Sequence, residues 1–246
     1  MREFEFRFNF LIWTTMDFVF LAMVFLGIEL IFGQVQSIAG WSRNEVLLLV
    51  LTTALFNDFM WTFFHINLMY FSDLVRLGNL DFALLKPVNS RFLISCRYFE
   101  FDHYLRMVVI VYSLSKLLSQ MGFNPSLVSW LVFFILFFLG LLIIYNFFFI
   151  LTTTNIWFIK IFNFSNLFED VADIARFPTS IFKGRLKYLF AYLIPTIFIA
   201  YFPVEFLLGR QGIEVVFYAF FTVIFFFVVS QWFWHFALKY YQGASS

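Results

Sequence analysis

Charged residues and cysteines are scarce in this chain. Only 13% of its 246 residues are charged, against about a quarter in an ordinary soluble domain. Lys plus Arg (16) nearly balance Asp plus Glu (15). These numbers exclude a freely soluble globular protein, a disordered chain and a nucleic-acid-binding protein that relies on a basic patch. The single cysteine, Cys96, excludes internal disulfides and a thiolate metal cluster built from this chain alone.

Motifs that carry catalysis are also missing. The chain has no G-x-x-x-x-G-K-[ST] phosphate loop, no H-E-x-x-H and no G-x-S-x-G. Its three histidines, His65, His103 and His235, lie far apart in the chain and lack the spacing of metal ligands. We therefore predict that this chain is not an enzyme and binds no metal.

Apolar residues make up most of what is present. Hydrophobic residues account for 63% of the chain and aromatic ones for 25%, with 43 phenylalanines, and the mean hydropathy is +0.88. A helix needs about 20 mostly apolar residues to cross a bilayer. Six stretches qualify, and they predict an all-α integral membrane protein with six transmembrane helices in one domain over residues 1–246: residues 10–31, 46–70, 104–121, 127–152, 186–208 and 215–237.

Two of these spans have weak points. The third is short and carries Arg106 and Lys116 near its ends. In the fifth, Pro195 and Pro203 leave backbone carbonyls without donors, so a kink or a partly re-entrant course is expected there.

The distribution of Lys and Arg predicts the orientation. With the N-terminus in the cytoplasm, twelve Lys and Arg residues lie on the cytoplasmic side, and only Arg43 and Arg210 lie in the outer loops. Cytoplasmic loops carry the excess of Lys and Arg in membrane proteins, so both termini are predicted to be cytoplasmic. The twelve are Arg2, Arg7, Arg76, Lys86, Arg91, Arg97, Lys160, Arg176, Lys183, Arg185, Lys187 and Lys239.

The cytoplasmic loop 76–91 is predicted to contain a short helix. Gly78 and Asn79 break the preceding helix, and Pro87 stops the one that begins near Leu80. About two turns fit between them, which is too short to be stable without a docking partner. Two interpretations follow from the spacing alone: a helix lying on lipid headgroups, or a contact for a cytoplasmic partner.

Polar residues inside the spans have two interpretations as well. Asp58, Thr62 and His65 fall at i, i+4 and i+7 and so share one helix face. They either line a polar path or link helices by hydrogen bonds. Asp17 and Glu29 lie towards the ends of the first span, where they can reach water.

Three local patterns add detail. Asp102 and Arg106 have the i, i+4 spacing of a helix ion pair. Ser42 and Glu45 have the spacing of a capping box at the start of the second span. The segment 163–181 is predicted to form a helix along the membrane surface, with an acidic face that is either solvated or contacts a partner: Glu169, Asp170 and Asp173.

Several motifs, taken in order, resemble the ABC-2 family of transporter permeases, in the branch of six-span permeases encoded beside a separate ATPase. The similarity covers nearly the whole chain, and it is carried by Ile38-Ala39-Gly40-Trp41-Ser42, Gly78-x-Leu80-Asp81-x-x-Leu84-Leu85-Lys86-Pro87, Phe177-Pro178-x-Ser180-Ile181-Phe182, Ile194-Pro195, Tyr201-Phe202-Pro203, Leu208-Gly209 and the ending Leu238-Lys239-Tyr240-Tyr241-x-x-Ala244-Ser245-Ser246.

The resemblance implies a type V exporter-like fold in a bacterial-type inner membrane. It implies that two permeases, identical or related, work with two cytoplasmic ATPase subunits, which bind ATP and Mg²⁺ while this chain binds no cofactor. It further implies that the loop 76–91 carries the coupling helix, whose ATPase contacts are Gly78, Leu80, Asp81, Leu84, Leu85, Lys86 and Pro87. Lys86 stands where the branch more often has Arg, and Lys cannot make a bidentate contact.

Two other classes remain open from the sequence. One is a membrane subunit that binds a small solute for an energy-coupled importer, which predicts a polar pocket towards the outer side. The other is an integral-membrane enzyme that modifies lipids, against which the missing catalytic cluster counts. The substrate itself is not specified by the sequence, because lipids, glycolipids, peptides and drug-like amphiphiles are all compatible with a path rich in phenylalanine.

Overall fold

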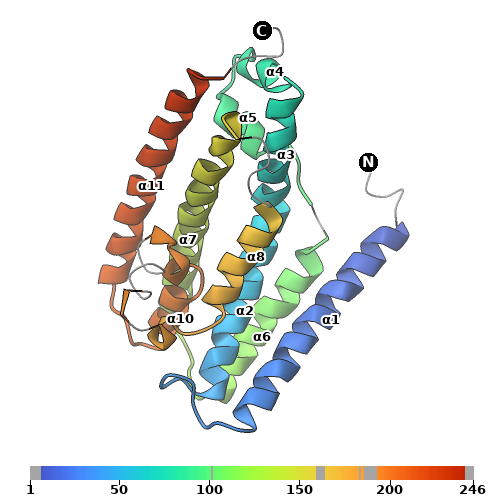
Figure 1. Ribbon diagram of the computed structural model, residues 1–246. Helices are drawn as coiled ribbons and strands as arrows, with labels where there is room; N and C mark the ends of the chain where they lie inside the picture. Colours follow the sequence, from blue (N-terminus) through green and yellow to red (C-terminus); the bar gives the residue numbers. More distant parts are fainter. Residues whose placement is uncertain (1–6, 101, 159–163, 183, 186–192, 242–246) are drawn as a thin grey trace.

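The computed structural model describes residues 7–100, 102–158, 164–182, 184–185 and 193–241, and this part of the chain is a bundle of helices (Figure 1). Apart from one isolated bridge between Ile38 and Trp41, its regular structure is helical. Four helical stretches are long and apolar enough to cross a membrane: Thr14–Phe32, Arg43–Arg76, Leu127–Ile156 and Glu214–Leu238. These correspond to the first, second, fourth and sixth predicted spans.

The second stretch is one continuous helix with a π-helical turn in its middle. It consists of α2 (Arg43–Met60), η2 (Trp61–His65) and α3 (Ile66–Arg76). Residues 46–51 of α2 are all buried. Because every side of the helix contacts protein there, the sequence of this segment is apolar on all sides. The whole stretch forms the centre of the bundle and continues about six residues beyond its predicted end.

The third predicted span is a shorter helix, α6 (Tyr104–Gln120), which packs beside α2. It has 17 residues, at the lower limit of the length expected of a membrane-crossing helix, about 17–25 residues. α1 (Arg7–Phe32) lies along α2 and α6 with most of its surface uncovered, since only 6% of its apolar stretch is buried (Figure 1).

The fifth predicted span is interrupted, as its prolines predict. Residues 186–192 lie outside the described part. From residue 193 onward the chain forms a single 3₁₀ turn, η6 (Thr196–Phe198), and a short helix, α10 (Tyr201–Leu207), instead of one continuous helix. Pro195 precedes the 3₁₀ turn, where a missing backbone N–H costs nothing.

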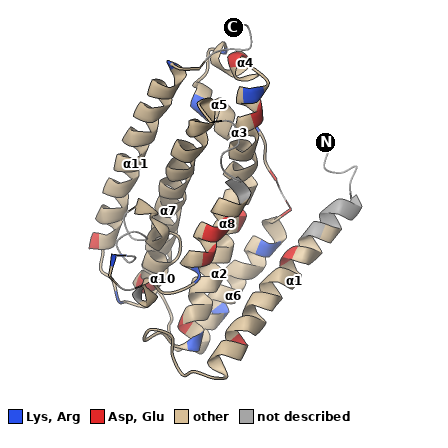
Figure 2. Ribbon diagram, viewed as in Figure 1, with Lys and Arg blue, Asp and Glu red and all other residues tan. Residues whose placement is uncertain are grey.

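The most extensive contact between two helices is that of α7 (Leu127–Thr153) with α11 (Glu214–Leu238). α7 contains no charged residue and α11 contains only Glu214 (Figure 2). At the middle of α7, Gly140 lies so close to the Phe198 carbonyl of η6 that a Cβ atom there would overlap the oxygen. Small residues at such crossings let membrane helices approach closely.

The predicted surface helix forms, but it occupies a different place. α8 (Phe164–Ala175) ends with the Ala175 carbonyl accepting a hydrogen bond from Thr53 Oγ1 at 3.3 Å, and its Phe168 ring lies 5.3 Å from the His65 ring. α8 therefore runs beside the middle of the α2–α3 helix, instead of lying along a membrane surface. Its apolar side is buried there, while Glu169, Asp170 and Asp173 are exposed (Figure 2). Arg176, which directly follows α8, lines a cavity with Val50 of α2. It therefore lies within the bundle, and its predicted place on the cytoplasmic side is wrong.

The N-terminal end of α2 is fixed by a capping box and by ion pairs. The Ser42 N–H donates to Glu45 Oε2 at 2.8 Å, as predicted. Arg43 pairs with Glu29 of α1, and Arg210 pairs with Glu45 and, at 3.4 Å, with Glu205. Both arginines of the predicted outer loops are thus neutralised by carboxylates.

The opposite end of the bundle carries two short helices, α4 (Leu80–Leu84) and α5 (Ser90–Ser95), close to the C-terminal end of the described chain (Figure 1). Gly78 has φ +69°, the left-handed conformation that ends α3 after Arg76. α4 confirms the short helix predicted to begin near Leu80, although it has one turn and not two. α5 was not predicted.

Candidate functional site

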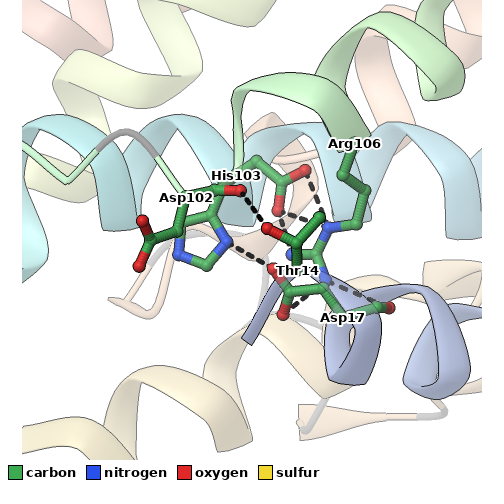
Figure 3. Close-up of polar contacts among 6 residues, drawn as sticks. Thr14, Asp17, Asp102, His103 and Arg106 are labelled. Carbon is green, nitrogen blue, oxygen red and sulfur yellow. Dashed lines mark hydrogen bonds and ion pairs between the residues drawn. The ribbon is translucent and has the colours of Figure 1, made fainter. Parts of the chain in front are cut away.

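A polar cluster inside the bundle joins three helices. Asp17 comes from α1, Asp58 from α2, and His103 and Arg106 from the start of α6 (Figure 3). Arg106 Nε lies 3.0 Å from both carboxylate oxygens of Asp58, and its Nη1 lies 3.0 Å from Asp17 Oδ1. The second Asp17 oxygen is 2.7 Å from His103 Nδ1.

This geometry corrects two expectations. Arg106 pairs with Asp58 and Asp17, and not with Asp102. α6 begins at Tyr104, so Asp102 precedes the helix and the i, i+4 geometry is not formed. Its carbonyl instead accepts a hydrogen bond from Thr14 Oγ1 at 3.4 Å (Figure 3). Asp17 is held by Arg106 and His103, with a side chain only 20% exposed, and does not reach out to water.

The predicted stripe Asp58, Thr62 and His65 is entirely buried, with 0%, 2% and 0% of each residue exposed. Only Asp58 belongs to the charged cluster. The Trp61 ring lies between the two histidines, 3.6 Å from the His65 ring and 6.1 Å from the His103 ring. Thr62 and His65 lie in the π-helical turn, which changes the register that the sequence spacing assumed.

The π-helical turn has a structural partner. The Thr62 carbonyl accepts a hydrogen bond from the Glu100 N–H at 3.1 Å. One turn further, the Asn67 side chain accepts from the N–H groups of Arg97 and Tyr98 and donates to the Tyr98 carbonyl at 2.8 Å. The connection from α5 to α6 is therefore attached along the α2–α3 helix.

A small cavity of about 50 Å³ adjoins the cluster. Arg106, Arg176 and Asn57 contribute its polar lining, and apolar residues from α1 and α2 complete it. Asn57 Oδ1 is buried there without a hydrogen-bond partner. A cavity of this size holds one or two water molecules, so the bundle keeps room for water next to Asp58.

The residues predicted to contact an ATPase lie in and around α4, where Gly78 is buried. Leu80 is completely buried and fixes α4 to the bundle, whereas Leu85 is 82% exposed. Asp81 and Leu84 are half-buried, and Lys86 and Pro87 are exposed. Phe82 and Val88, which the sequence did not single out, extend the exposed apolar surface of Leu85. We call Phe82, Leu85 and Val88 the apolar tip.

One buried cation was not identified by sequence reasoning. Arg91 of α5, which the orientation argument counted among the loop charges, is only 6% exposed and extends between α7 and α11. Its partners Tyr145, Asn146 and Gln231 lie more than 50 residues away in the sequence, so no local pattern could have revealed them.

With this geometry in view, comparison with known proteins decides the family. The sequence model of the ABC-2 family transporter proteins matches residues 18–245. The chain belongs to the ABC-2 family. The match takes in every helix from α2 to α11 and most of α1. No curated protein and no solved structure matches the chain.

Membership in the ABC-2 family makes this chain a membrane component of a transporter and not an enzyme. The four long apolar helices agree with a multi-pass membrane protein. The charged cluster and the apolar tip are accordingly features of an ABC-2 permease, one within the bundle and the other at its end.

Proposed function

We propose that this chain is the permease subunit of an ATP-binding cassette exporter that works with a separate cytoplasmic ATPase. The observation that carries the proposal is the ABC-2 match over residues 18–245. In this proposal the partner binds ATP and Mg²⁺, and this chain forms the path together with a second permease, identical or related.

The charge distribution supports a cytoplasmic position for the α4 end and for both termini. Arg43 and Arg210, at the other end, both pair with carboxylates. The α4 end has Arg76, Lys86, Arg97 and Lys239. Within the described part of the chain only Arg76 of these four forms an ion pair, with Asp73 at 3.2 Å. Net positive charge therefore collects at the α4 end, which the positive-inside tendency assigns to the cytoplasm.

The apolar tip supports the assignment of α4 as the coupling helix. Phe82, Leu85 and Val88 expose 69%, 82% and 52% of their surface beyond the bundle, where a groove on an ATPase can bury them. Behind the tip, Leu80 is buried, and Tyr241 packs near Asp81. Burial and this carboxylate raise the pKa of the Tyr241 hydroxyl. The apolar tip is thus exposed, while the contacts of Leu80 and Tyr241 fix α4 to the bundle. A contact that transmits movement from a partner needs both properties.

For the polar stripe, the contacts support the interhelical role more than the path-lining role. Asp58 is fully buried and its carboxylate is bonded to Arg106. In our proposal the cluster holds α1 to α2 and α6, and the cavity beside Asn57 and Arg106 leaves room for water next to it.

The test is co-purification from the native membrane in mild detergent, followed by mass spectrometry. We expect an ATPase with a phosphate loop in roughly equal amount. Leu85→Asp should reduce its recovery about tenfold or more, because burying a leucine contributes about 1.5–3 kcal/mol and a buried carboxylate adds a cost.

Val35→Asp is the matched control. Val35 is also exposed, at 42%, but lies in the loop at the opposite end of the bundle. It should leave the recovery of the ATPase unchanged. If no ATPase co-purified, the proposed function would be wrong. If both variants lost the ATPase equally, only the coupling role of α4 would be wrong.

A further inference from the structure

α5 places a cationic side chain between α7 and α11, the two helices with the most extensive mutual contact. Arg91 Nη2 donates to Asn146 Oδ1 of α7 at 2.5 Å, and Nη1 donates to Gln231 Oε1 of α11 at 3.1 Å. Its Nε lies 3.4 Å from the Tyr145 hydroxyl of α7. One guanidinium therefore bonds to both helices at once.

The charge of Arg91 is balanced without a carboxylate among the described residues. Its guanidinium carbon lies 4.3 Å from the centre of the Phe149 ring and 5.3 Å from that of Phe227. Aromatic faces and neutral oxygens stabilise a buried cation. They do so here only while α5, α7 and α11 keep their present relative positions. Any sliding of α5 against α7 and α11 would leave a buried charge unsatisfied, which is costly.

The contacts around Arg91 join α5, α7 and α11 into one unit. Ser95, at the other end of α5, has its hydroxyl 2.6 Å from the Tyr145 hydroxyl. Ser230 of α11 donates to Asn146 Oδ1 at 2.7 Å, so this oxygen accepts from both Arg91 and α11. Both ends of α5 are thereby attached to α7.

α5 is also attached to α4. The two helices are in contact and only residues 85–89 separate them. Asn89 caps α5 by accepting a hydrogen bond from the Phe92 N–H at 3.2 Å, and the Val88 N–H bonds to the Lys86 carbonyl at 2.8 Å. This short connection leaves α4 little freedom to move without α5.

We propose that Arg91 is the positioning residue that transmits movement of the α4–α5 loop to α7 and α11. The inference rests on the proposed function, because an ATPase bound at the apolar tip supplies the movement. It goes beyond that function by naming the helices that the movement reaches, α7 and α11. The side chain acts as a rigid link: α4 moves α5, and Arg91 moves the α7–α11 pair.

The experiment measures whether α11 responds to nucleotide. Spin labels are placed on Tyr112 of α6 and Val228 of α11, both exposed at 66% and 57%, in a Cys96→Ser background. The distance between the labels is compared in the complex purified with its ATPase, without nucleotide and with ATP and vanadate. We expect a shift in the unaltered complex and loss of the shift in Arg91→Met, with the ATPase still bound.

Three further variants separate transmission from stability. Arg91→Lys keeps the charge but replaces the planar guanidinium, with its three nitrogens, by a single ammonium nitrogen on a shorter side chain, so it should keep only part of the shift. Gln231→Met removes the one hydrogen bond from Arg91 to α11 and should reduce the shift. Arg97→Met is the control, because Arg97 is exposed and its guanidinium lies over the ring of the neighbouring Tyr98, at 5.2 Å, away from the contacts of Arg91. It should leave the shift intact.

The outcomes are distinguishable. A full shift in Arg91→Met, or no shift in the unaltered complex, overturns the inference while the bound ATPase upholds the proposed function. Failure of any ATPase to co-purify overturns the proposed function, and the inference with it. Should Arg91→Met aggregate on gel filtration, Gln231→Met combined with Phe227→Leu decides, because it removes both contacts of Arg91 with α11: an unchanged shift refutes the link.

Discussion

Charged side chains inside this bundle hold a helix that apolar packing alone would not. α1 exposes Met23, Leu26 and Leu30 at 64%, 62% and 73%, and in a bilayer such residues gain nothing by leaving lipid for protein. Inside the bundle, α1 contributes Asp17, which is bonded to Arg106 and His103; at its C-terminal end Glu29 pairs with Arg43. Since Arg106 also binds Asp58, one guanidinium joins α1 and α2 to α6.

Removing Arg106 should therefore destabilise the protein strongly. Arg106→Met leaves the Asp58 carboxylate buried without a counter-charge, which costs about 3–5 kcal/mol. At roughly 2–4 °C per kcal/mol for a chain of this size, the apparent melting midpoint in detergent should fall by about 6–20 °C.

Two further variants check this explanation. Asp58→Leu added to Arg106→Met should recover part of the loss, because it removes the unpaired charge. Lys116→Met is the control on the same helix, where the side chain is exposed, and it should change the midpoint little. If the double variant were no more stable than Arg106→Met alone, the ion pair would not be the cause.

The partners of buried charges were beyond sequence reasoning for a simple reason. Asp58 and Arg106 are 48 residues apart, and Arg91 and Gln231 are 140 apart. Periodicity places a residue on a face of its own helix, so it could indicate that Asp58 needed a polar partner. It could not say which helix supplies it, because that depends on how the helices pack.

At the scale of elements, hydropathy predicted the long helices well and the short ones poorly. α7 and α11 lie within a residue or two of their predicted bounds, because a run of 25 apolar residues has few alternatives. α5 and the course of α8 are set by tertiary contacts, such as Arg91 with Asn146 and Thr53 with Ala175. Such contacts leave no periodic signal.

The crossing of α7 and η6 depends on one glycine. Gly140→Ala places a Cβ against the Phe198 carbonyl oxygen, and overpacking of this kind typically costs about 1–3 kcal/mol. Gly27→Ala is the matched control, since nothing lies within 4 Å of the added Cβ on α1 and alanine favours helix. Thermal unfolding in the same detergent should show a lower midpoint for the first variant only. Equal midpoints would mean that η6 moves aside without cost.

At the scale of the whole molecule, the two ends of the bundle differ in whether their cationic side chains form ion pairs. The end that carries Arg43 and Arg210 neutralises both in ion pairs with Glu29 and Glu45. The other end exposes Lys86 beside the apolar tip. One end is closed by its own contacts, and the other presents groups that a partner can bind.

This asymmetry predicts which end faces the cytoplasm. In a Cys96→Ser background, Gln36→Cys and Lys86→Cys place one exposed thiol at each end. A membrane-impermeant maleimide added to intact cells should label Gln36→Cys at once and Lys86→Cys only after lysis, because the end with net positive charge stays inside. Labelling of both in lysed cells controls for access. The reverse pattern would place α4 outside, where no cytoplasmic ATPase can reach Leu85, and both the coupling role of α4 and the link through Arg91 would then be wrong.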